Sequence, residues 1–366
     1  MSGQIGAMSY RVAVIGQSNS ILQTGYVAHL MRRPEIELGH MGRIGASPSV
    51  ILPFYAAPEW IAGHDVCILD IAVMDHVFLW SEAIDLASIA QYLAYAIQMV
   101  HAAGALPLLL IIPHQAALPH RNAGMKVHPL HQIYRAVAAQ HDAMVLDLTD
   151  GLDALGRHSP TALEAAYSDP NHPAEQLQRS IADRIVALIE EAAHTSIERR
   201  RVSAAVPNFE RLGLVGLCPE APGIVHGTSL FQGRFTIIRP GDRLVLQTGR
   251  FDRLHGLLIN RSQCGAKLVM EGDRIVVKAV GTKNERDMPL VVQLCSVVTP
   301  VRDRDGVLVL SIADPHADVS EESCNPLDEH FGHAEIGEIL IERGWQAIDY
   351  DAPILPPSLA MPHWWP

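Results

Sequence analysis

The chain has 366 residues and a mass of 40.0 kDa, enough for two domains at about 150 residues each. Hydrophobic residues make up 48% and charged residues 19%, which is typical of a globular protein and excludes a disordered chain. The 28 basic and 40 acidic residues give a formal charge of −12. A net acidic chain is poorly suited to bind phosphates, which attract clustered Lys and Arg, so we expect neither a nucleic acid nor an anionic membrane as a partner.

The most apolar stretch, residues 102–118, is interrupted by a glycine and two prolines, so we expect no transmembrane segment. The first apolar run contains Arg11 and lacks the cleavage site of a signal peptide. The five cysteines form no C-x-x-C pair, which favours reduced thiols over a disulfide framework. These features together predict a cytoplasmic protein.

In the first half of the chain, apolar runs typical of buried strands alternate with segments of helical spacing. Such alternation predicts a parallel sheet with helices on both faces. Strands are expected at 10–15, 36–40, 65–71, 106–112 and 143–148, and helices at 19–32, 81–103, 129–141 and 173–193. We therefore expect an α/β domain over residues 1–195.

The pattern changes after residue 195. Residues 196–207 carry three consecutive arginines and a proline, and they are typical of a linker. Short strands separated by turn residues follow, which is the pattern of an antiparallel sandwich of jelly-roll type. They are expected at 212–217, 234–238, 243–248, 254–260, 266–270, 274–280, 290–298 and 307–312. An all-β, jelly-roll-like domain is therefore predicted over residues 208–366, ending in a tail rich in proline and tryptophan.

A tight turn with a serine follows the first strand. Residues 16–19 read Gly-Gln-Ser-Asn, and the predicted helix begins directly after them. Ser18 thus lies at the carboxyl edge of the sheet, where open α/β sheets bind their ligands. Its backbone N–H lies at a helix N-terminus and is suited to hold an oxyanion. The simpler alternative, that Ser18 only caps the helix, explains this motif alone equally well.

A second polar motif precedes the last predicted helix of the first half. Residues 169–172 read Asp-Pro-Asn-His and fall on a loop at the same edge of the sheet as Ser18. A serine hydroxyl needs a base to become a nucleophile, and histidine is the usual base at neutral pH. A carboxylate then orients the imidazole. His172 and Asp169 supply both groups, whereas an isolated Asp-x-x-His usually marks a capped turn.

With these two motifs the chain resembles the SGNH hydrolases, the GDSL-like esterases and lipases, over residues 9–193. Residues 16–19 are similar to the family's first block, with Gln17 where Asp often stands. Residues 43–47 resemble the second block, and residues 169–172 match the fifth. The resemblance implies a three-layer α/β/α fold with about five parallel strands. It also implies Ser18 as nucleophile, His172 as general base and acid, Asp169 as orienting carboxylate, and the N–H groups of Ser18 and Gly45 as oxyanion donors.

The third block departs from the family pattern. Where the family has an asparagine whose side chain donates to the oxyanion, this chain has Met74, and a thioether donates no hydrogen bond. Losing one oxyanion donor typically costs a factor of about 10²–10³ in rate. His76 and Asn19 are candidate replacement donors.

Three further groups of residues are weaker candidates. His330 and His333 have the spacing of two metal ligands, but we expect no metal site, because chance proximity is common among 19 histidines. Four histidines after the third clear strand could line the pocket rim, but we favour the interpretation that they are solvated loop residues. They are His114, His120, His128 and His131. Three tryptophans could stack on sugar rings, but packing of the tail is the preferred reading; they are Trp345, Trp364 and Trp365.

The sequence therefore favours a serine esterase that hydrolyses or transfers an acyl group, acetyl by analogy, on a carbohydrate or polysaccharide. We expect no cofactor. A glycan or small-molecule ester is the expected substrate, and polysaccharide-synthesis machinery is a candidate partner. One alternative is a lipid or small-ester hydrolase. Another is a carbohydrate-binding or scaffold protein that has lost turnover, which Met74 would permit.

Overall fold

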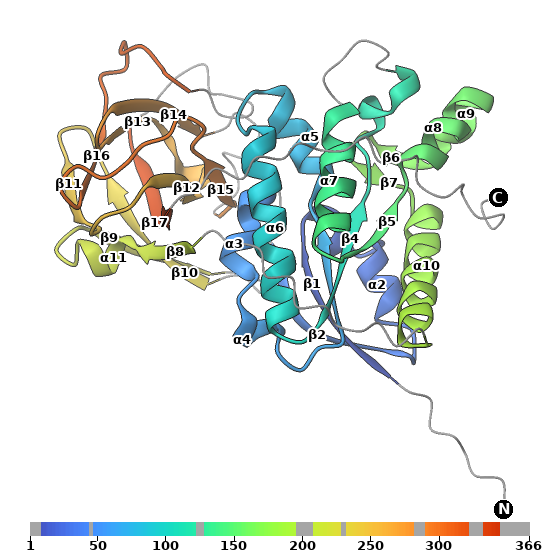
Figure 1. Ribbon diagram of the computed structural model, residues 1–366. Coiled ribbons are helices and arrows are strands. Elements are labelled where there is room, and N and C mark those ends of the chain that lie inside the picture. Colours follow the sequence, from blue (N-terminus) through green and yellow to red (C-terminus); the bar gives the residue numbers. More distant parts are fainter. Residues whose placement is uncertain are drawn as a thin grey trace, which may run out of the picture.

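The structure is a computed structural model that describes residues 9–43, 47–121, 128–194, 208–227, 232–281, 290–321 and 332–344. An α/β half and an antiparallel half lie side by side (Figure 1). The predicted linker at 196–207 and the tail from residue 345 onward lie outside the described residues. No helix in these ranges is long and apolar enough to cross a membrane.

The α/β half is built on a five-stranded parallel sheet. Its strand order is β2-β1-β3-β4-β5, and every neighbouring pair is parallel. The strands are β1 (Tyr10–Gly16), β2 (Ile36–Arg43), β3 (Val66–Asp70), β4 (Leu106–Ile111) and β5 (Met144–Asp147). Most residues of β1, β3 and β4 are buried because helices cover both faces of the sheet, as their continuous apolar runs predict.

The helices of this half form two layers. Alternate residues of β1 belong to different cores: Ala13 and Ile15 pack with α3, α5, α6 and α7, whereas Val12 and Val14 pack with α2 and α10. The helices are α1 (Ser18–Ile21), α2 (Tyr26–Leu30), α3 (Leu52–Tyr55), α4 (Pro58–Ile61), α5 (Ala72–Trp80), α6 (Leu86–Ala102), α7 (His128–Gln140), α8 (Thr149–His158), α9 (Pro160–Ala165) and α10 (Glu175–His194). The predicted arrangement of helices on both faces of a parallel sheet is thus confirmed.

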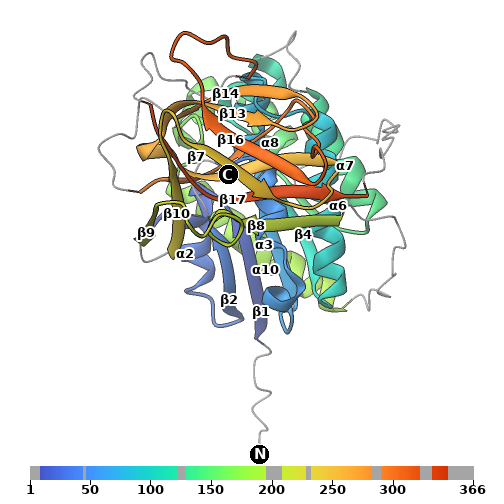
Figure 2. The same ribbon diagram turned by 90° about the vertical axis from the view of Figure 1, so that its left-hand side faces the viewer.

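The other half consists of two antiparallel sheets around one core. The larger has the order β15-β12-β17-β10-β9, with β8 also paired to β17, and the smaller has the order β11-β16-β13-β14 (Figure 2). The elements are β8 (Asn208–Gly213), α11 (Leu214–Leu217), β9 (Gly223–Gly227), β10 (Gln232–Ile238), β11 (Arg243–Gln247), β12 (Arg253–Asn260), β13 (Gly265–Glu271), β14 (Ile275–Gly281), β15 (Val292–Ser296), β16 (Val307–Ile312) and β17 (Ala334–Arg343). The prediction of an all-β second half is confirmed.

The sequence did not predict several short elements, among them α5, α8 and β9, and three further differences have a physical reason. The helix expected at 19–32 is two short helices, because the backbone leaves the helical conformation at Leu22, where ψ is 140°. Gly25 then passes so close to the Asn19 carbonyl group that no side chain would fit there. The strand expected at 212–217 ends at residue 213 and continues as α11. The central strand β17 was not predicted, because its three glutamates are typical of a solvated segment. Two of them, Glu335 and Glu342, are buried and hydrogen-bonded to histidines.

The two halves share part of their apolar core. Leu258, Leu294 and Leu340 of the antiparallel half belong to the same buried cluster as the residues of α3 and α6. A buried polar contact accompanies them, since the Tyr92 hydroxyl on α6 lies 2.8 Å from Nδ1 of His255 on β12. Burying this apolar surface stabilises the arrangement at about 25 cal/mol per Å².

Candidate active site

Ser18 lies where β1 ends at the carboxyl edge of the sheet and α1 begins. Gln17 occupies the N-cap position in extended conformation, and no side chain caps this helix. Ser18 is therefore not the cap of α1, as the simpler sequence interpretation would have it. Its side chain is partly exposed, and its backbone N–H has no acceptor among the described residues.

His172 and Asp169 approach Ser18 from a small hairpin between α9 and α10, formed by β6 (Tyr167–Asp169) and β7 (His172–Pro173). Nε2 of His172 lies 2.8 Å from Oγ of Ser18, across 154 positions of sequence. Nδ1 of the same ring lies 2.7 Å from Oδ2 and 2.9 Å from Oδ1 of Asp169. The three predicted residues are thus brought together in the order hydroxyl, imidazole, carboxylate.

The Asp169 carboxylate also organises the loop that carries it. Its Oδ1 accepts the backbone N–H groups of Asn171 at 2.9 Å and of His172 at 3.2 Å. Burial raises the pKa of Asp169, but the His172 side chain and these backbone donors outweigh it, so the pKa lies below its usual value. Asp169 therefore stays ionised at neutral pH and favours the tautomer in which Nδ1–H of His172 donates to it. Nε2 is then free to take the Ser18 proton.

A second loop supports the hairpin. The backbone N–H of Gln115 donates to the Pro170 carbonyl at 2.8 Å, which joins the loop after β4 to the turn between Asp169 and His172. His114 precedes it, and its ring meets Trp80 of α5 edge-on at a centroid distance of 4.7 Å. Burial lowers the pKa of His114 to about 4, against an opposing effect of the Asp169 charge. His114, a candidate for the pocket rim that was favoured as a solvated loop residue, is thus a half-buried, neutral imidazole in contact with Trp80.

The structure describes only some of the predicted oxyanion donors. Gly45 lies outside the described residues. Met74, in the first turn of α5, is partly buried and packs against both cores of the α/β half. Asn19 is buried, and its side-chain amide donates to the Asn171 carbonyl at 3.3 Å. Asn19 therefore supports the histidine loop through its side-chain amide, and its predicted role as a replacement oxyanion donor stays a prediction. The N–H of Ser18 is the donor left at the site among the described residues.

His76 is also engaged elsewhere. It is 1% exposed, its Nδ1 lies 2.9 Å from the Ala72 carbonyl, and its Nε2 lies 2.7 Å from Nε2 of His131. Burial, and next the neighbouring His131, lower its pKa well below the usual value, so the ring is neutral. The suggestion that His76 replaces the missing oxyanion donor is therefore wrong, since both ring nitrogens already have partners inside the protein.

The remaining histidines also differ from expectation. His131, expected on a solvated loop, is buried and contacts His76 and the Thr149 hydroxyl. His120 is paired with Asp153 at 2.8 Å. The side chain of His128, together with His330, Trp345, Trp364 and Trp365, lies outside the described part of the chain. Among the described residues, no group of three His, Cys, Asp or Glu side chains is placed to hold a metal ion.

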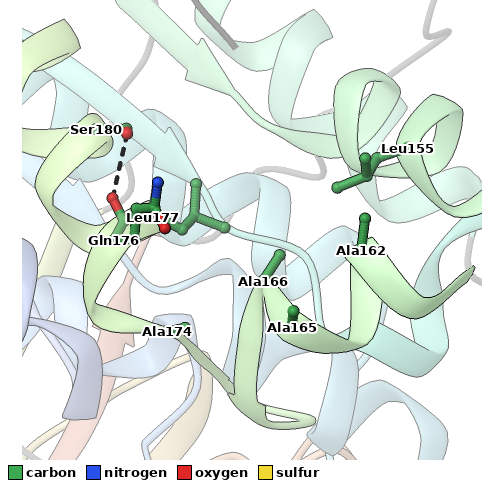
Figure 3. A pocket seen from close by; sticks show the side chains of 8 residues that line it. All are labelled: Leu155, Ala162, Ala165, Ala166, Ala174, Gln176, Leu177 and Ser180. Atoms are coloured by element: carbon green, nitrogen blue, oxygen red, sulfur yellow. Dashed lines mark hydrogen bonds between the residues drawn. The ribbon is translucent and has the colours of Figure 1, made fainter. Parts of the chain in front are cut away.

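A hollow of about 290 Å³ lies beside the histidine loop, between α8, α9 and the start of α10 (Figure 3). Leu155, Ala162 and Leu177 are among its apolar lining, and Gln176 and Ser180, joined by a hydrogen bond, lie at one side. None of Ser18, Asp169 and His172 lines it. Because it contains no titratable side chain, it is not where the proposed chemistry takes place.

No family model and no curated protein matches this sequence. Solved structures do match its fold. A two-domain esterase (CEX) active on acetylated mannans is 10% identical and aligns over 93% of both chains, with a TM-score of 0.60. The same kind of esterase co-crystallised with mannopentaose aligns over 93% of this chain and 92% of its own, with a TM-score of 0.56 and 10% identity. The likeness extends over both halves of this chain, and the α/β half has the fold of the SGNH, or GDSL-like, hydrolases.

Proposed function

We propose that the protein is a serine esterase that hydrolyses or transfers an acyl group. The observation that carries this proposal is the contact series from Ser18 Oγ through His172 to Asp169, at 2.8 Å and 2.7 Å. In this mechanism, His172 takes the Ser18 proton while Oγ attacks the ester carbonyl. The imidazolium then protonates the leaving alcohol, and water or another alcohol releases the acyl group by the reverse steps.

We further propose that the ester is an acetyl group on a carbohydrate. The support is analogy: the matched two-domain esterase is described as active on acetylated mannans, and it shares this two-part fold.

The test measures the activity of the full chain on a small ester and on an acetylated polysaccharide, together with its reaction with a serine-directed probe. We expect release of p-nitrophenol from p-nitrophenyl acetate, labelling of Ser18 by a fluorophosphonate, and release of acetate from acetylated mannan. Ser18→Ala is the matched control, and it should abolish all three.

Two other functions make different predictions in the same assays. A lipid hydrolase would prefer p-nitrophenyl esters with long acyl chains and leave the acetylated polysaccharide intact. A binding or scaffold protein without turnover would show neither p-nitrophenol release nor labelling of Ser18, and this result would reject the esterase proposal.

A further inference from the structure

Ser47 connects the two halves of the molecule close to the nucleophile. It is fully buried in the loop after β2, and its Oγ accepts the backbone N–H of Leu294, 247 positions away on β15, at 3.1 Å. Its carbonyl oxygen accepts the side-chain amide of Gln17 at 2.6 Å. One residue thus bonds to the antiparallel half through its side chain and to the residue before Ser18 through its main chain.

Gln17 is the second member of this series. Its Nε2 donates to both Ser47 and the Ile71 carbonyl, the latter at 3.0 Å, and only 2% of its surface is exposed. An aspartate, which often stands here in the resembled family, is an acceptor when ionised and could not satisfy these two buried carbonyls. The amide therefore fixes the nucleophile turn between the loops that follow β2 and β3.

β15 is firmly seated against the α/β half. The Leu294 side chain is fully buried in the core that the two halves share. Two residues further along, the Ser296 hydroxyl donates to the Ala83 carbonyl just before α6. β15 is also the edge strand of its sheet that lies beside the α/β half (Figure 1). A strand held at both sites can serve as a fixed support for Ser47.

We propose that the antiparallel half positions the nucleophile through the series Leu294 N–H to Ser47 Oγ, and Gln17 amide to Ser47 carbonyl. The proposal rests on the esterase function proposed above. It implies that β15 is needed for turnover of any ester, including one too small to bind the antiparallel half as a glycan would. Gln17 and Ser47 are positioning residues, because they act through the placement of Ser18. Misplacing a reacting group by about 1 Å can cost about 10²-fold in rate.

The test compares two serine-to-alanine variants of the full chain on p-nitrophenyl acetate. Ser47→Ala removes the acceptor of the Leu294 N–H. Ser296→Ala removes an equally buried bond between the halves that does not lead toward Ser18, and it is the matched control. We expect both to lower Tm by about 2–4 °C. Only Ser47→Ala should lower kcat and the rate of fluorophosphonate labelling, by about tenfold with KM unchanged. This loss corresponds to a displacement of the Ser18 hydroxyl by a fraction of an ångström.

Gln17→Met provides a second variant in case Ser47→Ala folds poorly. It keeps the approximate size of the side chain, removes both donors and leaves the Ser47–Leu294 bond in place. We expect a similar loss of kcat, and the double variant should lose less than the product of the single losses, since the two bonds belong to one series.

Equal kcat in Ser47→Ala and Ser296→Ala, or independent losses in the double variant, would overturn the positioning proposal while leaving an active wild-type esterase. A wild-type protein that neither cleaves the ester nor reacts with the fluorophosphonate would instead overturn the proposed function itself.

Discussion

Nε2 of Gln178, on α10, donates a hydrogen bond at 3.0 Å to Oδ1 of Asn19, the residue after Ser18. The Asn19 amide in turn donates a hydrogen bond to the Asn171 carbonyl, in the loop that carries His172. Oε1 of Gln178 accepts the backbone N–H of Tyr26 at 3.0 Å. The turn that carries Ser18, α2 and the loop that ends in His172 are therefore joined through the two buried amides of Gln178 and Asn19.

We expect Gln178→Leu to lower both stability and kcat. It leaves the Asn19 carbonyl oxygen and the Tyr26 N–H without their partner, at a cost of about 1–3 kcal/mol in the free energy of unfolding. The loosened histidine loop should lower kcat on p-nitrophenyl acetate several-fold, within the roughly 10²-fold that a 1 Å displacement can cost. Gln176→Leu, at an exposed position of the same helix, is the control. Matching kcat values for the two variants would show that the Gln178 network does not place His172.

The sequence predicts which residues meet at the site, because the order of strands and helices fixes where each loop emerges. Ser18 follows β1 and His172 precedes α10, and parallel strands bring such loops to one edge. The contacts of Gln178 and His114 could not be predicted in this way. A glutamine within a helix and a histidine after a strand carry no local signal, and their role depends on side-chain directions set by tertiary packing.

In the antiparallel half, too, contacts between residues far apart in sequence could not be predicted from the local pattern. Alternating apolar residues predict most of its strands, but β17 was missed because Glu335 and Glu342 are buried. Each is satisfied by a histidine on another strand, 109 and 87 positions away. Pairings at such separations leave no mark in the local pattern. The shared core is equally hidden, since Leu294 has the same apolar character whether it faces its own sandwich or the α/β half.

Removing members of the contact series should have unequal effects on turnover. We expect Ser18→Ala and His172→Ala to reduce kcat by roughly 10⁴-fold or more, because neither nucleophile nor base can be replaced. Asp169→Asn should cost less than Ser18→Ala, since its role is to orient and stabilise the imidazole. All three side chains are partly exposed or exposed, so thermal unfolding should change little. Wild-type kcat in Ser18→Ala would refute the assignment of the nucleophile.

Asp70 should make stability depend on pH. It is the last residue of β3, is fully buried, and burial raises its pKa to about 7, against a smaller opposing effect of Tyr26. Below about pH 4 both the folded and the unfolded states hold the proton. Between about pH 4 and 7 the unfolded state loses it while the folded state keeps it. The free energy of unfolding therefore falls as pH rises through this window.

We expect Asp70→Asn to flatten this fall, by up to about 1.4 kcal/mol per pH unit, because the amide cannot ionise. Denaturant unfolding at pH 4.5 and at pH 7 measures the change. Glu190→Gln, at an exposed position on α10, is the control and should keep the wild-type pH dependence. An Asp70→Asn variant with the wild-type pH dependence would contradict a neutral Asp70 in the folded protein.

In the proposed esterase, Met74 occupies the position that would supply a side-chain oxyanion donor. By position it stands where the resembled family has a donating asparagine, and the structure places it in the first turn of α5, three residues after Ile71, whose carbonyl accepts the Gln17 amide. We expect Met74→Asn to raise kcat on p-nitrophenyl acetate, with a ceiling of about 2.7–4 kcal/mol of transition-state stabilisation. The gain should fall well below that ceiling, because the surrounding side chains are apolar and do not orient an amide.

The substitution should also lower stability, since Met74 packs against both cores of the α/β half and an asparagine fills less apolar space. Met74→Leu and Met74→Ala separate packing from hydrogen bonding, because neither can donate. A rise in kcat with Asn alone would identify a missing donor at this position. Equal losses of kcat with Asn and Ala would mean that the thioether serves as an apolar wall of the acyl site. With both ring nitrogens of His76 engaged in other contacts, the backbone N–H of Ser18 and the Asn19 amide would then be the candidate oxyanion donors among the described residues.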